Sequence, residues 1–258
     1  MVCVREVKTK KKDVLNLIRK IIYKNEIIDK TAIREILKSE NIVLEDSTFR
    51  NYIQELKNLK YISSIKKGVY TTSIKSKYFP DINKKLVEIF LPISKEMIID
   101  RSCIWETSWL NEFMIHQAMS SKIILEVDPD VLESVYYFIK DNVYKKVFIN
   151  PDEKIIHQYI SGESEPLILL PIIGRSPLKH INKITIPKLE KILVDVFSNT
   201  VLYYWLQGQE FINIFTNAYE KYQMNFSILF SYASRRGTDK KLKNFLLDKT
   251  DIPEELIG

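Results

Sequence analysis

Residues 46–72 read DSTFRNYIQELKNLKYISSIKKGVYTT, and this stretch decides how the first part of the chain is expected to fold. Its first half, residues 46–59, begins with Asp46 and Ser47, which are residue types that cap helices. The apolar residues that follow recur at intervals of three and four: Phe49, Tyr52, Ile53 and Leu56. This spacing places them on one side of a helix, which we expect to be buried against a core.

The second half of the stretch, residues 61–72, predicts a β-hairpin. It alternates and is rich in β-branched residues on both sides of Lys67-Gly68, a pair that favours a tight turn. Lys66 and Lys67 would therefore lie at the tip of the hairpin, where their positive charges are available to a polyanion.

The side of the 46–59 helix opposite its apolar residues has the chemistry for reading a DNA major groove. Its polar residues are spaced i, i+3, i+4 and i+7: Ser47, Arg50, Asn51 and Gln54. Arginine can donate two hydrogen bonds to guanine, asparagine or glutamine can pair with adenine, and serine can bind a phosphate. The alternative for this stripe is an ordinary solvated helix face.

Two further helices are predicted upstream, over residues 13–25 and over residues 31–39, with Asp29 or Thr31 available to cap the second. Three short helices followed by a hairpin form the winged variant of the helix-turn-helix, in which the third helix enters the major groove and the hairpin, or wing, contacts the DNA backbone. We therefore expect a winged-helix DNA-binding domain over residues 1–75. The residues expected to contact DNA are Ser47, Thr48, Arg50, Asn51, Gln54, Lys57, Lys66 and Lys67.

The charge of the chain changes sign along its length. Residues 1–85 carry 20 lysines and arginines against 10 acidic residues, whereas residues 86–258 carry 19 against 23. A basic first part suits a polyanionic partner, although a lysine-rich solvated surface would give the same balance. The lysines near the N-terminus are expected to form either a flexible phosphate-binding arm or only a solubilising tail: Lys8, Lys10, Lys11 and Lys12.

The composition of the chain also indicates in which cellular compartment the protein is expected. The sequence has no uncharged apolar run of eighteen residues, and its N-terminus lacks the apolar core of a signal peptide. Cys3 and Cys103 show no paired spacing, which argues against a disulfide framework or a cysteine-rich zinc site. We expect a soluble cytoplasmic protein without a membrane partner, a metal or a cofactor.

Residues 76–85 lose periodicity and are predicted to link the first domain to a mixed α/β domain over residues 86–258 that ends in helices. The class expected for the whole chain is thus α+β. Strands are expected over residues 86–91, 98–100, 123–127, 147–149, 155–160, 167–173 and 184–186. Helices are expected over residues 108–119, 129–141, 188–197, 207–222, 226–234 and 240–247.

Few signatures of catalysis occur in this second part. No histidine has a second ligand at helical or hairpin spacing, and neither Gly162-Glu163-Ser164 nor Gly174-Arg175-Ser176 completes a nucleophile elbow. The strand-end pair Glu126 and Asp128 could hold a divalent cation, but no lysine follows at nuclease spacing. Three arginines could bind a phosphate or an acidic partner, or else be solvated or paired locally: Arg175, Arg235 and Arg236.

With these residues in view, the sequence resembles AbiEi-type antitoxins, the transcriptional regulators of type IV abortive-infection toxin-antitoxin systems. The resemblance spans nearly the whole chain and depends on two pieces. One is the winged helix that ends in the hairpin Lys67-Gly68-Val69-Tyr70. The other is residues 184–195, ITIPKLEKILVD, which is similar to the family's apolar strand followed by Pro-x-x-Glu and Leu-x-Asp. Residues 105–111 depart from the family pattern.

The resemblance implies a repressor of its own operon that binds operator repeats in double-stranded DNA and neutralises a nucleotidyltransferase-like toxin. It implies no enzymatic activity. In the matching motif, Pro187 suits a helix start and Glu190 favours the helix dipole, so these roles, with that of Asp195, are expected to be structural.

Two alternatives to this function remain. The second part could be a metal-dependent nuclease or a nucleotidyltransferase-like enzyme centred on Glu126 and Asp128, with the winged helix directing it to DNA. Alternatively, the winged helix could bind a protein in place of DNA.

Overall fold

The structure, a computed structural model, describes residues 11–72, 75–97, 99, 101–116 and 120–257. Its buried apolar side chains form two clusters, one drawn from residues 14–70 and the other mainly from residues 78–257. We refer to residues 11–72 as the N-terminal region and to residues 75–257 as the C-terminal region. Both contain helices and strands, so the α+β class expected from the sequence is confirmed.

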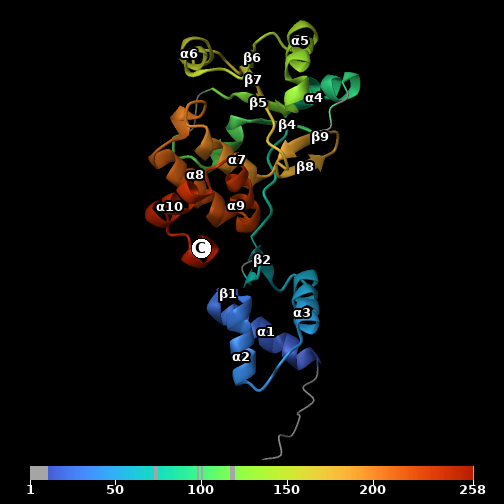
Figure 1. Ribbon diagram of the computed structural model, residues 1–258, viewed down its shortest axis with the longest axis vertical. Coiled ribbons are helices and arrows are strands. Elements are labelled where there is room, and N and C mark those ends of the chain that lie inside the picture. Colours follow the sequence, from blue (N-terminus) through green and yellow to red (C-terminus); the bar gives the residue numbers. More distant parts are fainter. Residues whose placement is uncertain (1–10, 73–74, 98, 100, 117–119, 258) are drawn as a thin grey trace, which may run out of the picture.

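The N-terminal region packs helices on one side of a small antiparallel sheet. In chain order its elements are α1 (Lys11–Asn25), β1 (Ile27–Asp29), α2 (Lys30–Ser39), α3 (Asp46–Asn58), β2 (Ser63–Lys66) and β3 (Val69–Thr71) (Figure 1). The strand order is β1-β3-β2, so β3 lies in the middle. Lys67 and Gly68 form the β2–β3 turn, where the φ of +81° at Gly68 favours glycine.

The three helices of the N-terminal region form where the periodicity of their apolar residues predicted them. The Asp29 side chain accepts a hydrogen bond from the Ala32 N–H and so caps α2, as one of the two expected caps. The predicted cap of α3 is wrong, because Glu45 precedes the helix without a side-chain cap bond. Lys11 and Lys12 belong to α1 and not to a flexible arm, since Lys11 forms an ion pair with Glu55 of α3 at 2.7 Å. Lys8 and Lys10 lie outside the described residues.

The C-terminal region is built on a mixed sheet with the strand order β4-β5-β7-β6. These strands are β4 (Ser102–Glu106), β5 (Ile123–Val127), β6 (Val147–Ile149) and β7 (Leu167–Pro171). β4 pairs antiparallel with β5, whereas β5, β7 and β6 run parallel. A hairpin of β8 (Leu178–Ile181) and β9 (Ile184–Pro187) packs beside β4.

Helices cover both faces of this sheet (Figure 1). The first ones are α4 (Lys84–Glu96), α5 (Leu132–Asn142) and α6 (Glu153–Ile155), which continues into a π-helical turn (Ile156–Ile160). Short 3₁₀ turns span Thr107–Phe113, Pro129–Val131 and Tyr204–Leu206. The ending is helical, as expected: α7 (Leu189–Ser198), α8 (Gln209–Lys221), α9 (Phe226–Arg235), α10 (Asp239–Lys249) and α11 (Glu254–Ile257). Figure 1 shows α5 above the sheet and α7 to α10 below it.

Several predictions for the C-terminal region were wrong. Residues 86–91 belong to α4 and not to a strand, because Asn83 caps a helix whose buried residues continue to Ile93. Residues 155–160 are helical, and only Thr107–Phe113 of the helix expected over 108–119 forms, as a 3₁₀ turn, with 117–119 outside the described residues. Ile98 and Asp100 of the strand expected over residues 98–100 also lie outside them, and β4 was not predicted.

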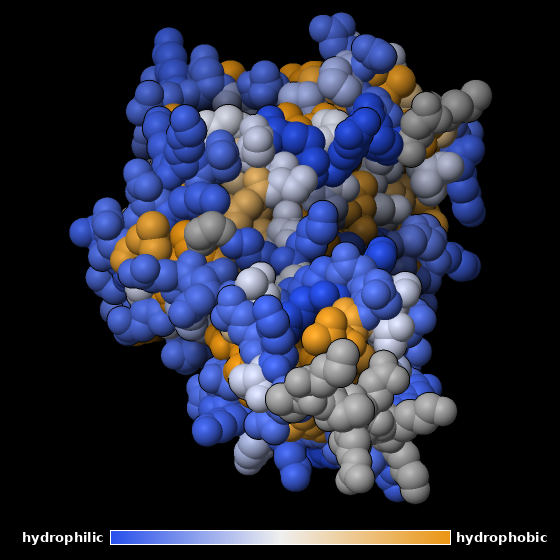
Figure 2. All heavy atoms as spheres, turned by 60° about the horizontal axis from the view of Figure 1, so that its bottom comes forward, coloured by the Kyte–Doolittle hydropathy of each residue, from blue (hydrophilic) through white to orange (hydrophobic). Residues whose placement is uncertain are grey.

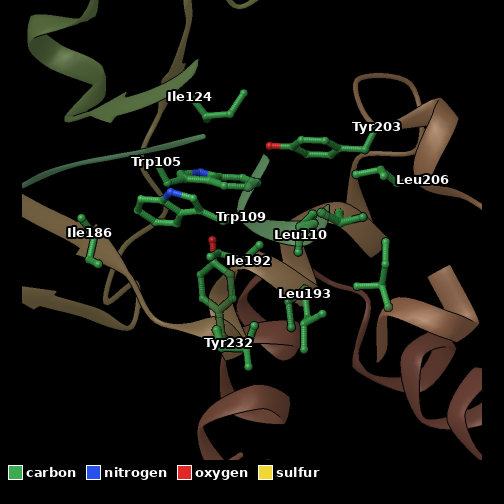
Figure 3. Packing of buried hydrophobic residues seen from close by; sticks show 14 of the residues in the cluster. Trp105, Trp109, Leu110, Ile124, Ile186, Ile192, Leu193, Tyr203, Leu206 and Tyr232 are labelled. Atoms are coloured by element: carbon green, nitrogen blue, oxygen red, sulfur yellow. The ribbon is translucent and has the colours of Figure 1, made fainter. Parts of the chain in front are cut away.

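The core of the C-terminal region is aromatic and includes charged groups. Trp105, on β4, is fully buried, with its ring centroid 6.1 Å from that of Tyr203 (Figure 3). Tyr232, from α9, and Ile192, from α7, line the same core. Among the residues described, no helix is both long and apolar enough to cross a membrane.

Candidate nucleic-acid interface

Helix α3 has the two faces that its spacing predicts. Phe49, Ile53 and Leu56 are buried in the N-terminal core. The predicted polar stripe is exposed along its whole length: Ser47, Arg50, Asn51 and Gln54. Figure 2 turns the N-terminal region toward the viewer and shows a mostly hydrophilic face interrupted by small hydrophobic groups. Helix α3 is therefore packed against the core on one face and exposes hydrogen-bonding groups to solvent on the other.

An ion-pair cluster holds the start of α3 against α2. The Asp46 carboxylate lies 3.1 Å from Lys30 Nζ and 2.6 Å from Arg34 Nη2. Its hydrogen bond from Lys30, together with the charges of Lys30 and Arg34, lowers the pKa of Asp46. Arg34 also lies over the Phe49 ring, 4.8 Å from its centroid. The position of Lys30 and Arg34 beside the start of α3 was not predicted, because their spacing on α2 alone does not show which helix they face.

Within the polar stripe, two side chains bond to their own helix. Arg50 Nε donates to the Asp46 carbonyl oxygen at 3.1 Å, and Gln54 Nε2 donates to Asn58 Oδ1 at 2.9 Å. Both bonds lie at the surface, where water competes for them, so they orient the side chains weakly. The remaining guanidinium nitrogens of Arg50 and the amide oxygen of Gln54 stay available for a partner.

The other two α3 residues of the predicted set lie beside the stripe. Thr48 is half-buried. Lys57 is also half-buried, with its ammonium 5.2 Å from the centroid of the Tyr70 ring, and burial lowers its pKa. Lys57 is thus a less accessible phosphate ligand than the sequence suggests.

The tip of the β2–β3 hairpin contacts the C-terminal region. The Lys67 N–H donates a hydrogen bond to Ser227 Oγ of α9 at 2.8 Å, and Lys66 Nζ lies 3.5 Å from the carbonyl oxygen of Glu255 in α11. Burial, with the nearby charge of Lys243, lowers the pKa of Lys66. The Lys67 side chain remains exposed.

The hairpin is also buried on both of its faces. Tyr70 belongs to the N-terminal core, whereas Ile65 and Val69 belong to the core of the C-terminal region. All three residues of β3 are buried, which is unusual for a strand with one solvated face. Figure 1 shows β2 at the junction of the two regions. The sequence signal for burial on both faces was the run Val69-Tyr70-Thr71, which has no charged residue on either face.

The two carboxylates of the enzyme alternative are each held by a cation. Glu126 is buried and accepts a hydrogen bond from Lys191 Nζ at 2.5 Å, while Asp128 lies 2.6 Å from Arg101 Nη2. Lys191 bonds Asp195 at the same distance. Across the part of the chain that the structure describes, no group of three His, Cys, Asp or Glu side chains could hold a metal ion.

Lys191 is the centre of this buried network, and sequence reasoning missed it. Its side chain is fully buried. Although burial disfavours an ammonium, the nearby Asp195 and Glu126 raise the pKa of Lys191 well above its usual range. Asp195 also accepts a hydrogen bond from the Tyr232 hydroxyl at 2.8 Å. The network joins β5, α7 and α9 across the core.

The remaining residues singled out in the sequence lie elsewhere. Glu190 is in the first turn of α7, as expected, and accepts a hydrogen bond from the Asn225 N–H at 2.8 Å. The histidines are exposed and scattered over the C-terminal region: His116, His157 and His180. Cys103 is buried, and burial raises the pKa of its thiol well above the usual value.

Comparison with known proteins gives a family. No curated protein and no solved structure matches the chain. A family model described as "Family of unknown function (DUF6577)" matches residues 48–252. The matched segment begins in α3 and ends just before α11, so it includes the hairpin as well as most of the C-terminal region. The chain belongs to the DUF6577 family.

Proposed function

We propose that this chain is a sequence-specific double-stranded DNA-binding protein whose N-terminal region is a winged helix. The observation that carries the proposal is the exposed stripe Ser47, Arg50, Asn51 and Gln54, which lies opposite the buried face of α3. Such a helix reads the major groove with arginine on guanine and with asparagine or glutamine on adenine.

The phosphate contacts are divided between the wing and the start of α3. The Lys67 side chain is exposed although its backbone N–H bonds Ser227, so the docked wing still offers one cation to a DNA backbone. Lys30 and Arg34 add positive charge beside Ser47, because they converge on Asp46. Phosphate contacts of this kind fix the register of a protein on the duplex and carry no sequence information.

The biological part of the proposal is that the protein represses its own operon and acts as an antitoxin. It depends on the resemblance to AbiEi-type antitoxins seen in the sequence, and not on the geometry of the site. In this proposal the C-terminal region neutralises a nucleotidyltransferase-like toxin in the cytoplasm and has no enzymatic activity. The gene beside this one should then encode such a toxin.

DNA binding can be tested without knowing the operator. The full chain would be used to select duplexes from a random pool, and the selected duplexes compared with shuffled ones in a mobility shift. We expect one motif to be enriched and Arg50→Ala to lose the preference for it. Lys20→Ala, which removes an exposed charge from α1, is the control and should keep that preference. No enrichment, together with no shift at low salt, would contradict the proposal.

A further inference from the structure

The carboxyl ends of β5 and β7 lie side by side, because these strands are paired and parallel. Asp128 follows β5 directly, and residues 172–177, a loop that contains Gly174-Arg175-Ser176, follow β7. In open sheets with parallel strands, ligands bind at this edge, where loops from neighbouring strands meet. The edge is not part of the proposed DNA interface.

Three segments of the chain bring four arginines to this end of the sheet, and Arg175 lies on the loop itself. Arg235, at the end of α9, donates from Nη2 to the Arg175 carbonyl oxygen at 2.9 Å. Arg101 also lies next to the loop, since a Cβ at Gly174 would be 3.7 Å from its Nη1. Arg236, the next residue after Arg235, reaches Asp195 with its Nε at 3.5 Å.

The carboxylates nearby neutralise only part of this charge. Asp128 pairs with Arg101, and Asp195 is shared between Arg236 and Lys191. Arg175 and Arg235 form no ion pair with any carboxylate in the described part of the chain. Arg235 Nη1 bonds only the Ser231 hydroxyl, at 3.0 Å, so its charge is not compensated there. Two positive charges therefore remain at the loop.

The backbone at Arg175 determines which replacement suits this position. Its φ is +56°, in the left-handed region that costs a non-glycine residue about 1–2 kcal/mol. Glycine would be favoured in this conformation. The Arg175 side chain is exposed, and its guanidinium is available to a ligand at the edge of the sheet.

We propose that Arg175 and Arg235, supported by Arg101 and Arg236, form a site for a phosphate group. The planar guanidinium donates two parallel hydrogen bonds to phosphate oxygens, and several of them around one loop match a multiply charged oxyanion better than a single carboxylate. The phosphate can come from a nucleotide or from the end of a nucleic-acid strand. The site is independent of α3 and of the proposed operator binding.

The first test is a calorimetric titration of the full chain with pyrophosphate. We expect saturable binding that weakens by about 10-fold to 100-fold when one arginine is removed, as for loss of a charge-assisted hydrogen bond. The variants are Arg175→Gly, which suits the positive φ and should fold at least as well, and Arg235→Ala. Arg235→Lys keeps the charge but loses the bidentate guanidinium donor, so it should bind pyrophosphate more weakly than wild type and more tightly than Arg235→Ala.

Lys145→Ala is the matched control, because this exposed lysine precedes β6 at the opposite edge of the sheet. It should bind pyrophosphate as wild type does, and so should Arg50→Ala. The source of the phosphate is tested with ATP and with a single-stranded oligonucleotide measured with and without its 5′-phosphate, so that any binding by α3 cancels. Failure of the wild-type chain to bind pyrophosphate, ATP or the 5′-phosphate would overturn the proposal, as would equal affinities in wild type, Arg175→Gly and Arg235→Ala.

Discussion

The backbone N–H of Lys67 donates a hydrogen bond to Ser227 Oγ, which is 160 residues further along the chain. This bond joins the turn of the β2–β3 hairpin to the first turn of α9. The hairpin that would flank DNA is therefore also a contact between the N-terminal and C-terminal regions.

The hairpin should contribute to the stability of the whole chain. Ile65→Ala is expected to lower the free energy of unfolding by about 2–4 kcal/mol, because Ile65 fills the core of the C-terminal region. Ser227→Ala should cost about 0.5–1.5 kcal/mol for one hydrogen bond. Both are measured by urea denaturation. Ser234→Ala, on the exposed side of the same helix, is the control and should change little. An Ile65→Ala variant as stable as wild type would show that the hairpin does not dock in solution.

Arg50 and Lys67 should differ in how their loss affects DNA binding. Arg50→Ala is expected to cost about 1–3 kcal/mol at one operator position and to relax the preference there, because it removes a base contact. Lys67→Ala should weaken all sequences alike and reduce the salt slope by about one, because it removes a phosphate contact. Competition mobility shifts over a range of salt concentrations measure both. Equal losses on operator and random DNA for the two variants would refute the base-reading role of Arg50.

Lys191 should contribute strongly to the stability of the fold. Lys191→Met leaves the buried Glu126 without its ion-pair partner and Asp195 with only Arg236, and removal of one partner from a buried pair costs about 3–5 kcal/mol. Calorimetric melting of the variant should show a large fall in Tm. The double variant Lys191→Met with Glu126→Gln should recover part of the loss, since the unpaired charge of Glu126 is then gone. A Tm equal to that of wild type would contradict the assignment of Lys191 as the centre of the network.

The link between α2 and α3 should weaken in acid. Lys30 and Arg34 lower the pKa of Asp46, so its contribution to stability is present above the unfolded-state pKa of about 4 and is lost as the pH falls through the lower folded-state value. Asp46→Asn should therefore be less stable than wild type at neutral pH, and the difference should shrink below pH 4. Urea denaturation at several pH values measures it. A difference that does not vary with pH would contradict this ion pair.

The N-terminal region was largely predictable because its information is local. Apolar spacing located α1, α2 and α3, and Lys67-Gly68 located the turn. Periodicity failed over residues 86–91, where the short apolar run LVEIFL fits a strand as well as a buried helix. The docking of Lys67 on Ser227 joins positions too far apart for any local pattern to predict.

Lys191 illustrates a signal that was present but not used. Lysine is almost never fully buried, so a lysine in a helix is usually assigned to the solvent side. Every residue from Leu189 to Val196 is buried, however, and the sequence LEKILVDV is apolar around the whole helix except for its charged residues. A helix that is hydrophobic all round is enclosed by protein, so its Lys191 and Asp195 had to find partners inside.

The two buried faces of the hairpin have a practical consequence for dividing the chain. A fragment ending at residue 75 would leave Ile65 and Val69 without the apolar partners that cover them. The fragment should self-associate through this surface, so a DNA-binding assay on it would report an aggregate. The complementary fragment would lose the side chains that complete its own core. The chain should therefore melt in a single cooperative transition.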